Sequence, residues 1–450
     1  MTIPKGIDDI PEIFFTWDDI LSGGLPALLA REAEAKGPLL KLKDKWQPGE
    51  NYILFMVGPE ANRFVLHTHR QHFSHDQGWT PLIGDTLGHG LLNMDEPQHT
   101  IHRRLWNPAF ASAYMTAYYP IIKKVIDHRT ATWADEHEID LFHEAREITF
   151  DVAAAALGGI ERGEEVDHLR DLFYRLLHGY DSSMGSYEDY LVEEKRITGE
   201  LTRILLGLIA ERRKLKPTDK PRDVLEMIVH ARDDQGNTLD DIQVLAHTNI
   251  LLVAGHETTT SLSAWVLYLL AANPDYREKI LAELDSLPAN PDGSVTLEAL
   301  RDARFLDVFI KEAGRLYPPV INVPRGVLQD FEFAGYHVPA GMQVRLAIGG
   351  GHHLGSVFDN PEDFDPTRFL PPRDEEKRTP YSLITFGGGP RICIGMYFAQ
   401  VEVKALVAKV LRSFEIEPVE NQNLRHAGHW TAFLPDGIKI RVKNRETVNA

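Results

Sequence analysis

Apolar residues recur every three or four positions over long stretches of the chain, which is the spacing of one face of a helix. The helices that this spacing predicts are Met115–Trp133, Glu165–His178, Glu188–Lys214, Leu239–Asn273, Tyr276–Ser286, Leu306–Tyr317 and Gly395–Phe414. The alternation typical of strands is confined to Asn51–Val57, Gly326–Phe333, Gln343–Ala347 and Ile438–Val442. The pattern predicts a mainly α-helical protein with small β-sheets.

The composition is that of an ordinary globular protein. The chain has 450 residues, of which 43% are hydrophobic and 25% charged. No Ser/Gly-rich or Pro-rich linker and no repeat of fixed period divides it. We therefore expect a single domain over residues 1–450.

The charge balance argues against nucleic acid as a partner. Acidic residues number 66 against 48 basic ones, giving a formal charge of -18, and no Lys/Arg-rich tract is present. The N-terminus has neither the basic start nor the apolar run of a signal or anchor, so we expect a cytoplasmic protein without a membrane anchor. The apolar stretch Leu245–Ala272 is interrupted by His247, Asn249, His256 and Glu257, which predicts a buried helix rather than a membrane span.

The single cysteine lies at the end of a long irregular segment. Residues 349–390 are rich in Gly, Pro, Asp and Asn, and they lead to Phe386-Gly-Gly-Gly-Pro-Arg-Ile-Cys393-Ile-Gly395, where a helix begins. Amides at a helix N-terminus lower the pKa of a cysteine and stabilise its thiolate. The glycines would allow a flat cofactor to approach, which is the geometry wanted for an axial thiolate on haem. The alternative is a buried structural cysteine in a Gly-rich turn.

The spacing around this cysteine decides between the two interpretations. The pattern F-x-x-G-x-R-x-C-x-G fixes five positions, and a chain of this length matches it by chance on the order of 10^-4 of the time. The loop resembles the haem-binding signature of the cytochrome P-450 superfamily. The resemblance implies that haem b is the cofactor and that Cys393 is the proximal ligand of its iron. It also implies haem contacts from Phe386, Gly387, Arg391 and Gly395.

A second motif agrees with this resemblance. Glu312 and Arg315 share a face of one predicted helix, but the same E-x-x-R spacing begins at Glu60, Glu193, Glu200, Glu298 and Glu375, most of which we interpret as solvated pairs. Glu312 differs because its position before Tyr317-Pro-Pro and upstream of the cysteine matches the family. The resemblance implies that Glu312, Arg315 and Arg368, in Pro-Thr-Arg-Phe, form a buried ion network that holds the cysteine loop. A surface pair is the alternative.

The long helix carries a third motif, Ala254-Gly255-His256-Glu257-Thr258. A glycine there costs about 1 kcal/mol relative to alanine, and a charge and hydroxyl groups interrupt an otherwise buried face. The segment resembles the family's A/G-G-x-D/E-T motif, which implies that Ala254 and Gly255 border the cofactor and that Glu257 and Thr258 relay protons to O2. Alternatively, Thr258 only bonds back to the carbonyl four residues before it.

Further basic residues resemble the family's partners for the haem propionates. These are His99 and Arg103, in an H-x-x-x-R segment, with Arg325 and Arg391. The segment 351–355 departs from the family, because it lacks the usual polar-Arg-Asp-Pro sequence. A separate cluster of histidines could supply metal ligands, although we favour a solvated helix; it comprises His67, His69, His72 and His75.

The resemblance implies a soluble, bacterial-type haem-thiolate monooxygenase that inserts one oxygen atom of O2 into a lipophilic small molecule by hydroxylation or epoxidation. No flavin or iron-sulfur segment is visible, so we expect a ferredoxin or flavodoxin as electron donor, bound at a local basic patch including Arg104, Lys377 or Arg378. The residues expected to line the substrate site are Trp79, Leu82, Leu87, Leu91, Leu92, Val320, Ile321, Trp430 and Phe433. A peroxygenase, a haem-thiolate isomerase and a haem-based gas sensor are the alternatives.

Overall fold

The computed structural model describes residues 4–43, 52–160, 163–178, 186–218, 221–428 and 431–445. The helices are α1 (Trp17–Leu21), α2 (Leu25–Lys36), α3 (Pro59–Arg63), α4 (Asp76–Leu87), α5 (Gln98–Trp106), α6 (Ser112–Arg129), α7 (Trp133–Glu136), α8 (Leu141–Gly158), α9 (Glu164–His178), α10 (Tyr187–Arg213), α11 (Val224–His230), α12 (Asp241–Ala272), α13 (Pro274–Ser286), α14 (Leu297–Leu300), α15 (Arg304–Leu316), α16 (Ile348–His352), α17 (Glu375–Arg378) and α18 (Met396–Ser413). The strands are β1 (Leu39–Lys43), β2 (Tyr52–Val57), β3 (Phe73–Ser74), β4 (Glu138–Asp140), β5 (Asn322–Val327), β6 (Phe331–Phe333), β7 (Tyr336–Val338), β8 (Gln343–Ala347), β9 (Phe414–Pro418), β10 (Ala427–Gly428), β11 (Ala432–Phe433) and β12 (Lys439–Asn444).

The chain forms two compact units. The first comprises Met1–Gly78, Ile126–Ala145 and Thr258–Ala450, and the second comprises Trp79–Val125 and Arg146–Glu257. Helix α12 contributes its first half to the second unit and its second half to the first.

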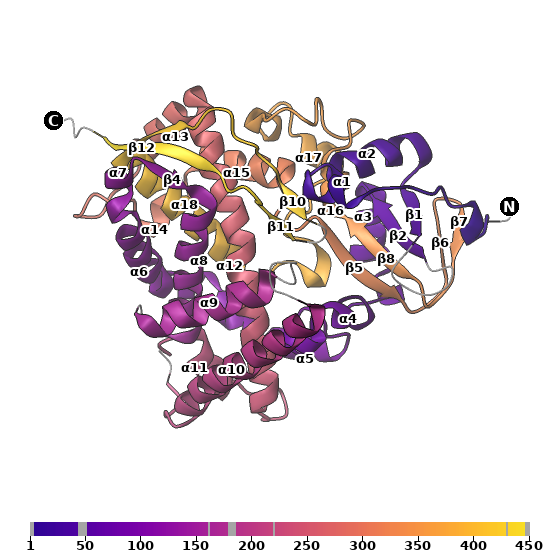
Figure 1. Cartoon of the computed structure of the whole chain (residues 1–450), viewed down its shortest axis with the longest axis horizontal. Helices are drawn as coiled ribbons and strands as arrows, with labels where there is room; N and C mark the ends of the chain where they lie inside the picture. The colour runs from indigo at the N-terminus through magenta and orange to yellow at the C-terminus, as the bar shows by residue number, and fades with distance from the viewer. Residues whose placement is uncertain are drawn as a thin grey trace. The chain divides into compact units, whose positions relative to one another are not determined.

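A five-stranded sheet dominates one part of the first unit. Its order is β1-β2-β8-β5-β3, with β2 and β8 parallel and the other neighbours antiparallel (Figure 1). Leu54 and Met56 of β2 and Val344 and Leu346 of β8 are buried in one apolar cluster. Because side chains alternate across a strand, residues two apart enter the same core.

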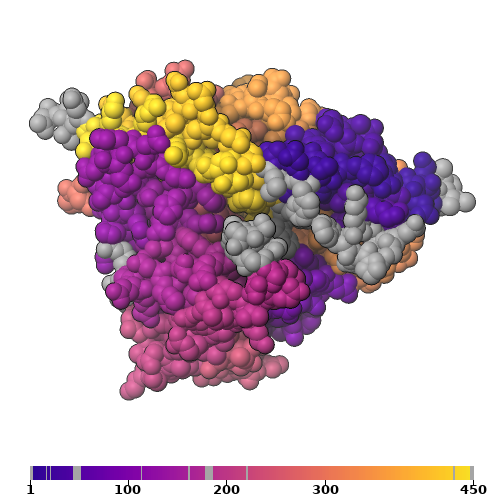
Figure 2. All heavy atoms as spheres, in the orientation of Figure 1, coloured from indigo at the N-terminus to yellow at the C-terminus, as the bar shows by residue number. Residues whose placement is uncertain are grey.

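In the rest of the first unit, α13 contacts both α15 and α18. The first turn of α15 is fixed by Glu283 of α13, whose carboxylate accepts hydrogen bonds from the backbone N–H groups of Phe305 and Leu306 at 2.8 and 3.0 Å. Helix α18 also packs on α13, and its chain continues into β9 of the sheet β4-β12-β9. Alternate residues of β12 are exposed, and this yellow C-terminal segment lies on the visible surface in Figure 2.

The second unit is helical. Ile197, Leu201, Leu205 and Ile209 of α10 are buried, and their spacing of four places them on one face. Helix α10 packs on α9 and α11 (Figure 1). None of the helices that the structure describes is both long enough and apolar enough to span a membrane.

Most of the predicted elements are found within a few residues of the expected bounds. The predicted helix Met115–Trp133 ends at Arg129, where a 3-10 turn follows. The predicted strand Gly326–Phe333 is wrong as a single element, because β5 and β6 are separated by an exposed turn whose Asp330 carboxylate accepts from the N–H of Ala340 at 2.8 Å. Helices not expected from the spacing include α2, α4, α5 and α8.

Candidate functional site

The cysteine loop connects a short helical turn, Gly389–Arg391, to α18. The backbone N–H of Cys393 donates to the carbonyl of Phe386 at 2.9 Å, which closes the loop, and Gly395 is the N-cap of α18. Cys393 is nevertheless exposed, and so is the neighbouring Ile392. An exposed thiol just before a helix N-terminus is suited to act as a thiolate ligand.

The glycine positions in this loop are not equivalent. Gly389 has a φ of +61°, and an added Cβ would lie 2.4 Å from the carbonyl oxygen of Leu66. Gly388 is extended, with a φ of -173°, and its added Cβ would lie 3.3 Å from the Leu66 side chain. The loop conformation therefore requires glycine at position 389.

We expect Gly389→Ala to lower the stability of the holoprotein by about 1–3 kcal/mol, because the substitution combines a left-handed backbone with a backbone clash. Gly388→Ala is the matched control and should change stability by less than about 1 kcal/mol. Thermal unfolding and haem content of the two variants check this. Equal losses in both variants would contradict the assigned role of Gly389.

The structure brings Glu312, Arg315 and Arg368 together, and each side chain is fully buried. The carboxylate of Glu312 accepts from Arg315 Nε at 2.8 Å and from Arg368 Nε at 2.9 Å. A fourth member, Glu375, accepts from Arg368 at 2.8 Å and is also fully buried. Glu375 also contacts Arg373 at 2.6 Å and Arg378 at 3.5 Å, so the network extends from the buried groups to partly exposed ones. Glu375 begins an E-x-x-R segment like the partly exposed pair Glu193–Arg196, so its burial is not predictable from that spacing.

Hydrogen bonds connect this ion network to the start of the cysteine loop. Arg315 donates to the carbonyl of His352 at 2.8 Å, and the ring Nε2 of His352 accepts from the N–H of Ile384 at 3.0 Å. The Thr385 hydroxyl donates to the carbonyl of Gly314, next to Arg315, at 3.2 Å. Burial, helped by the charge of Arg315, lowers the pKa of His352 to about 3, so the ring is neutral and remains an acceptor. His352 lies in the segment whose sequence departs from the family.

The motif on α12 lies within an uninterrupted helix. Glu257 is held by Arg146 of α8 at 3.0 Å and by the ring of the adjacent His256 at 3.1 Å. Burial raises the pKa of Glu257, but the hydrogen bond and charge of His256 and the charge of Arg146 outweigh it and lower this pKa to about 2. The carboxylate therefore stabilises the folded protein above pH 4.5, and this contribution is lost as the pH falls towards 2.

Two residues before Glu257, the helix leaves space on one side. A Cβ added to Gly255 would meet only Leu157, at 3.8 Å, which is an ordinary contact distance, and Ala254 is exposed. Protein atoms among the described residues therefore do not exclude a side chain at Gly255. A ligand bound at this place would explain why position 255 has no side chain.

The basic residues predicted to bind the haem propionates differ in burial and in their hydrogen-bond partners. In the second unit, His99 is buried beside Glu96, 3.2 Å away, and Arg103 donates to Asn107 at 2.9 Å. In the first unit, Arg325 is 6% exposed and donates to the carbonyl of Pro324 at 2.6 Å, and Arg391 is half-buried in the cysteine loop.

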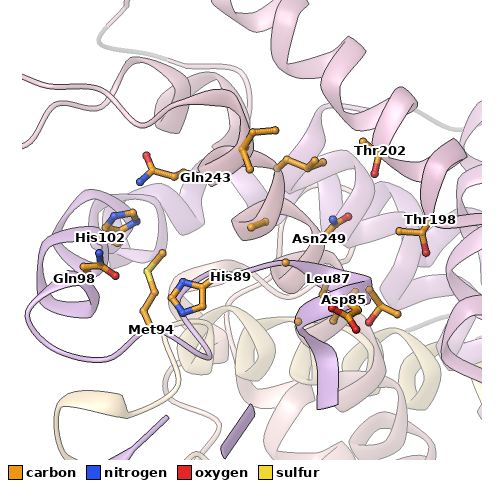
Figure 3. A pocket seen from close by; sticks show the side chains of 16 residues that line it. Asp85, Leu87, His89, Met94, Gln98, His102, Thr198, Thr202, Gln243 and Asn249 are labelled. Atoms are coloured by element: carbon orange, nitrogen blue, oxygen red, sulfur yellow. The ribbon is translucent and has the colours of Figure 1, made fainter. Parts of the chain in front are cut away.

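A cavity of about 350 Å³ lies within the second unit. Figure 3 shows Leu87, Met94 and His102 from one stretch of the chain around it, with Thr198 and Thr202 of α10. Its lining combines apolar side chains such as Leu87 and Met94 with many polar ones, including Gln98, Gln243 and Asn249.

Two buried histidines, His102 and His247, are hydrogen-bonded to each other, and His102 lines this cavity. The N–H of Leu91 donates to His247 Nδ1 at 3.2 Å, so the neutral ring has its proton on Nε2, which donates to His102 Nδ1 at 2.8 Å. His102 therefore carries its own proton on Nε2. Burial lowers the pKa of both rings, that of His247 to about 3, which keeps them neutral. The two residues are 145 positions apart, and no sequence pattern connects them.

Comparison with known proteins identifies the family. The model of the cytochrome P450 family matches residues 36–442. The chain belongs to the cytochrome P450 family. It is 30% identical over 413 residues to a sterol 14alpha-demethylase of Mycolicibacterium vanbaalenii, covering 89% of this chain and 90% of that protein. It is 29% identical over 404 residues to a putative cytochrome P450 136 of Mycobacterium tuberculosis, covering 89% of this chain and 80% of that one.

Solved structures agree with this assignment. A cyanobacterial CYP120A1 bound to retinoic acid superposes with a TM-score of 0.84 and 26% identity, over 98% of this chain and 99% of that one. The haem domain of cytochrome P450DA, at 23% identity, has a TM-score of 0.85 and supports the fold alone. The predicted mainly helical P450 fold is confirmed.

Membership of the cytochrome P450 family makes the protein a haem-dependent monooxygenase, an oxidoreductase with haem b as cofactor. The first unit suits such a flat, apolar group. The exposed Cys393 thiol lies between exposed Ile392 and half-buried Ile394 and Phe386, so apolar surface around the thiol is left for a cofactor to cover. The half-buried Arg391 beside the thiol is suited to pair with a propionate.

The residues predicted to line the substrate site of this P450 differ in burial. Those that are buried are Trp79, Leu87 and Ile321, and those that are half-buried are Leu82, Leu91, Leu92 and Val320. Phe433 is 38% exposed, and Trp430 lies outside the described residues.

Each residue of the expected basic patch has an acidic partner: Arg104 pairs with Asp234, Lys377 with Asp374, and Arg378 with Asp359 and Glu375. These three residues therefore do not supply a patch of unpaired positive charge.

The histidine cluster is arranged on short turns rather than on one solvated helix. His67 is in the short π-helix Phe64–Thr68, His72 is in a 3-10 turn, and His75 follows β3. His69 stacks on the ring of Phe64 at 3.9 Å between centroids. Over the described ranges of the chain, no group of three or more metal-ligating side chains is arranged to hold an ion.

Proposed function

We propose that this P450 inserts one oxygen atom of O2 into a lipophilic small molecule, by hydroxylation or epoxidation, with Cys393 as the axial ligand of the haem iron. The observation that carries the proposal is the exposed thiol of Cys393 at the N-terminus of α18, with its backbone N–H fixed to the carbonyl of Phe386 at 2.9 Å. When bound, the haem supplies the electron-transfer and oxygen-activating chemistry that amino-acid side chains lack.

The roles of the surrounding residues follow from their chemistry. The guanidinium groups of Arg325 and Arg391, with His99 and Arg103, would bind the two propionates by charge-assisted hydrogen bonds. The small or flat residues would leave room for the cofactor; they are Ala254, Gly255, Phe386, Gly387 and Gly395. Glu312, Arg315 and Arg368 would hold the cysteine loop in place through His352 and the backbone of Ile384.

Glu257 and Thr258 are the proposed route for protons. The hydroxyl of Thr258 would donate a proton from its Oγ1 to the oxygen being reduced and recover one from the Glu257 side. The carboxylate of Glu257 is suited to exchange protons with solvent, because it remains 15% exposed while Arg146 holds it in place.

The proposed substrate class follows from the names of two similar proteins. One relative is named a sterol 14alpha-demethylase, and one similar structure contains retinoic acid. Both names indicate large apolar molecules, which favours a lipophilic substrate here. We further propose that a separate ferredoxin or flavodoxin supplies the electrons, and that the chain acts as a single catalytic domain in the cytoplasm.

We expect Thr258→Ala to preserve haem content and substrate affinity while product formed per reduced carrier oxidised falls about tenfold. Without the hydroxyl, protons arrive less reliably, and the electrons leave as released hydrogen peroxide. The measurement counts product and peroxide in parallel on the best substrate. Thr259→Ala, a change of the adjacent buried threonine, is the matched control and should stay coupled.

Two outcomes would contradict this account of the reaction. Unchanged coupling in Thr258→Ala would remove the proton-relay role from that hydroxyl. Product formation with hydrogen peroxide but not with O2 and a reduced carrier would identify a peroxygenase instead of a monooxygenase.

A further inference from the structure

His256 is a fully buried histidine directly beside Glu257. Its ring packs against Phe150 of α8, with centroids 5.1 Å apart, and against Tyr174 of α9, 6.0 Å away. The hydroxyl of Thr149 also donates to the backbone carbonyl of His256 at 3.3 Å. These contacts fix the position of the ring and exclude water from it.

The two ring nitrogens of His256 have different partners. Nδ1 lies 2.6 Å from the carbonyl oxygen of Leu252. A carbonyl oxygen only accepts hydrogen bonds, so Nδ1 must carry a proton. In a neutral ring, Nε2 would then be an acceptor.

Nε2, however, lies 3.1 Å from Oε1 of Glu257. An unprotonated nitrogen and an ionised carboxylate are both acceptors and repel at this distance. The contact is favourable only when one proton lies between them, either on Nε2 or on Oε1. The geometry therefore stores one exchangeable proton on the His256–Glu257 hydrogen bond, next along the helix to Thr258.

The charged groups around the pair determine which atom holds this proton. Arg146 of α8 contacts both oxygens of Glu257, at 3.0 and 3.2 Å, and lies over the Tyr174 ring, 4.5 Å from its centroid. Burial raises the pKa of the Tyr174 hydroxyl, so that group remains neutral. The nearby charges Glu147, Asp151 and Asp167 are paired with Arg170.

Arg146 and the His256 ring together favour the carboxylate form of Glu257. The opposing effect of burial raises the pKa of Glu257, yet the outcome is a pKa of about 2. Glu257 is therefore a carboxylate at neutral pH, and its 3.1 Å contact with the ring is favourable when the shared proton lies on Nε2.

We propose that His256 is the positioning residue of Glu257 and the proton store of the relay. The inference rests on the proposed function, because it concerns the supply of protons to Thr258. One proton moves from Nε2 to Oε1, and Glu257 passes it on. A proton from solvent then restores the pair, and no electron is transferred in these steps.

The test measures the ionisation of Glu257 directly, by infrared difference spectra of the holoenzyme against Glu257→Gln. In the unmodified protein the carboxylate band should be present at pH 7, without the carbonyl band of a protonated acid. In His256→Gln, the titration of Glu257 should move up by about one pH unit or more, because a neutral amide does not replace the charge that His256 contributes. A protonated Glu257 at pH 7 in the unmodified protein would overturn the proposal, whether or not any His256 variant folds.

The pH profile of coupling is the second readout. The unmodified enzyme should form a constant amount of product per electron between about pH 6 and 8, because the relay holds its own proton. In His256→Gln no proton is held beside Glu257 between turnovers, so each transfer waits for one from solution, and product per electron should fall about tenfold from pH 6 to pH 8. His168→Gln is the matched control, because it changes an exposed histidine whose Nε2 lies 2.8 Å from Glu200. Parallel pH profiles of coupling in the unmodified enzyme, His256→Gln and His168→Gln would contradict the role of His256 as a proton store.

The carbonyl spectrum of each reduced protein separates this inference from the proposed function. A parent enzyme without the spectrum of a thiolate-bound haem overturns the proposed function and the relay with it. A parent enzyme with that spectrum but an unshifted Glu257 titration in His256→Gln overturns the role of His256 alone.

Discussion

Replacing Glu312 with alanine is expected to give protein that neither folds stably nor retains haem. The change leaves the guanidinium groups of Arg315 and Arg368 buried, each with 0% of its side chain exposed, and removes the carboxylate that both contact. Removing one partner of a buried ion pair lowers the free energy of unfolding by about 3–5 kcal/mol. A typical protein has a stability of only about 5–15 kcal/mol, so most of it would be lost.

The control for this variant is Glu376→Ala. Glu376 pairs with Lys311 at 2.5 Å, but both side chains are partly exposed, so the expected cost is about 0–1 kcal/mol. Expression yield, haem content and melting temperature distinguish the two variants. A Glu312→Ala protein that matches the Glu376→Ala protein in all three would show that the network does not hold the fold.

Replacing Cys393 with alanine should abolish the thiolate-haem spectrum and O2-dependent product formation. Cys393 is the single cysteine of the sequence, so no other thiolate of the chain can replace it. The fold should survive, because the hydrogen bond that Cys393 makes to Phe386 uses its backbone N–H, which alanine keeps. Absorbance spectra of the reduced carbonyl complex and product analysis are the measurements.

Cys393→His is the informative companion to the alanine variant. A histidine can still bind haem iron, but as a neutral nitrogen ligand, so its carbonyl spectrum should be of the histidine type. Retention of the thiolate spectrum in either variant would exclude Cys393 as the ligand.

The residues that sequence analysis identified are those whose chemistry is local in the chain. The cysteine loop places five diagnostic residues within ten positions, and Glu312 and Arg315 are one helical turn apart. Their identity and spacing therefore predict contact before any tertiary structure is known. The assignment of haem b from this loop is confirmed by membership of the P450 family.

The features that were missed depend on contacts between distant segments. Glu375 has the same E-x-x-R spacing as Glu193, yet the first is fully buried and the second lies in an exposed pair. Only tertiary packing separates them. The His102–His247 hydrogen bond joins α5 to α12 in the same way. His256 occupied the variable position of a recognised motif, where the pattern assigns no role.

The errors in the predicted secondary structure also arise where the local pattern is not decisive. Helix α4 contains Pro81 and two glycines, which lower its intrinsic helix propensity, so its spacing gave no clear helix signal. The predicted strand at 326–333 contained an exposed turn, because alternation of side chains continues through short turns and does not mark where pairing ends.

The reduced carbonyl absorbance spectrum of the unmodified protein tests the central claim most directly. If Cys393 binds haem iron as a thiolate, the Soret band must shift to the long wavelength characteristic of thiolate-bound carbonyl haem. A Soret band at the position of a histidine-ligated carbonyl haem, in correctly folded protein with full haem content, would contradict the account.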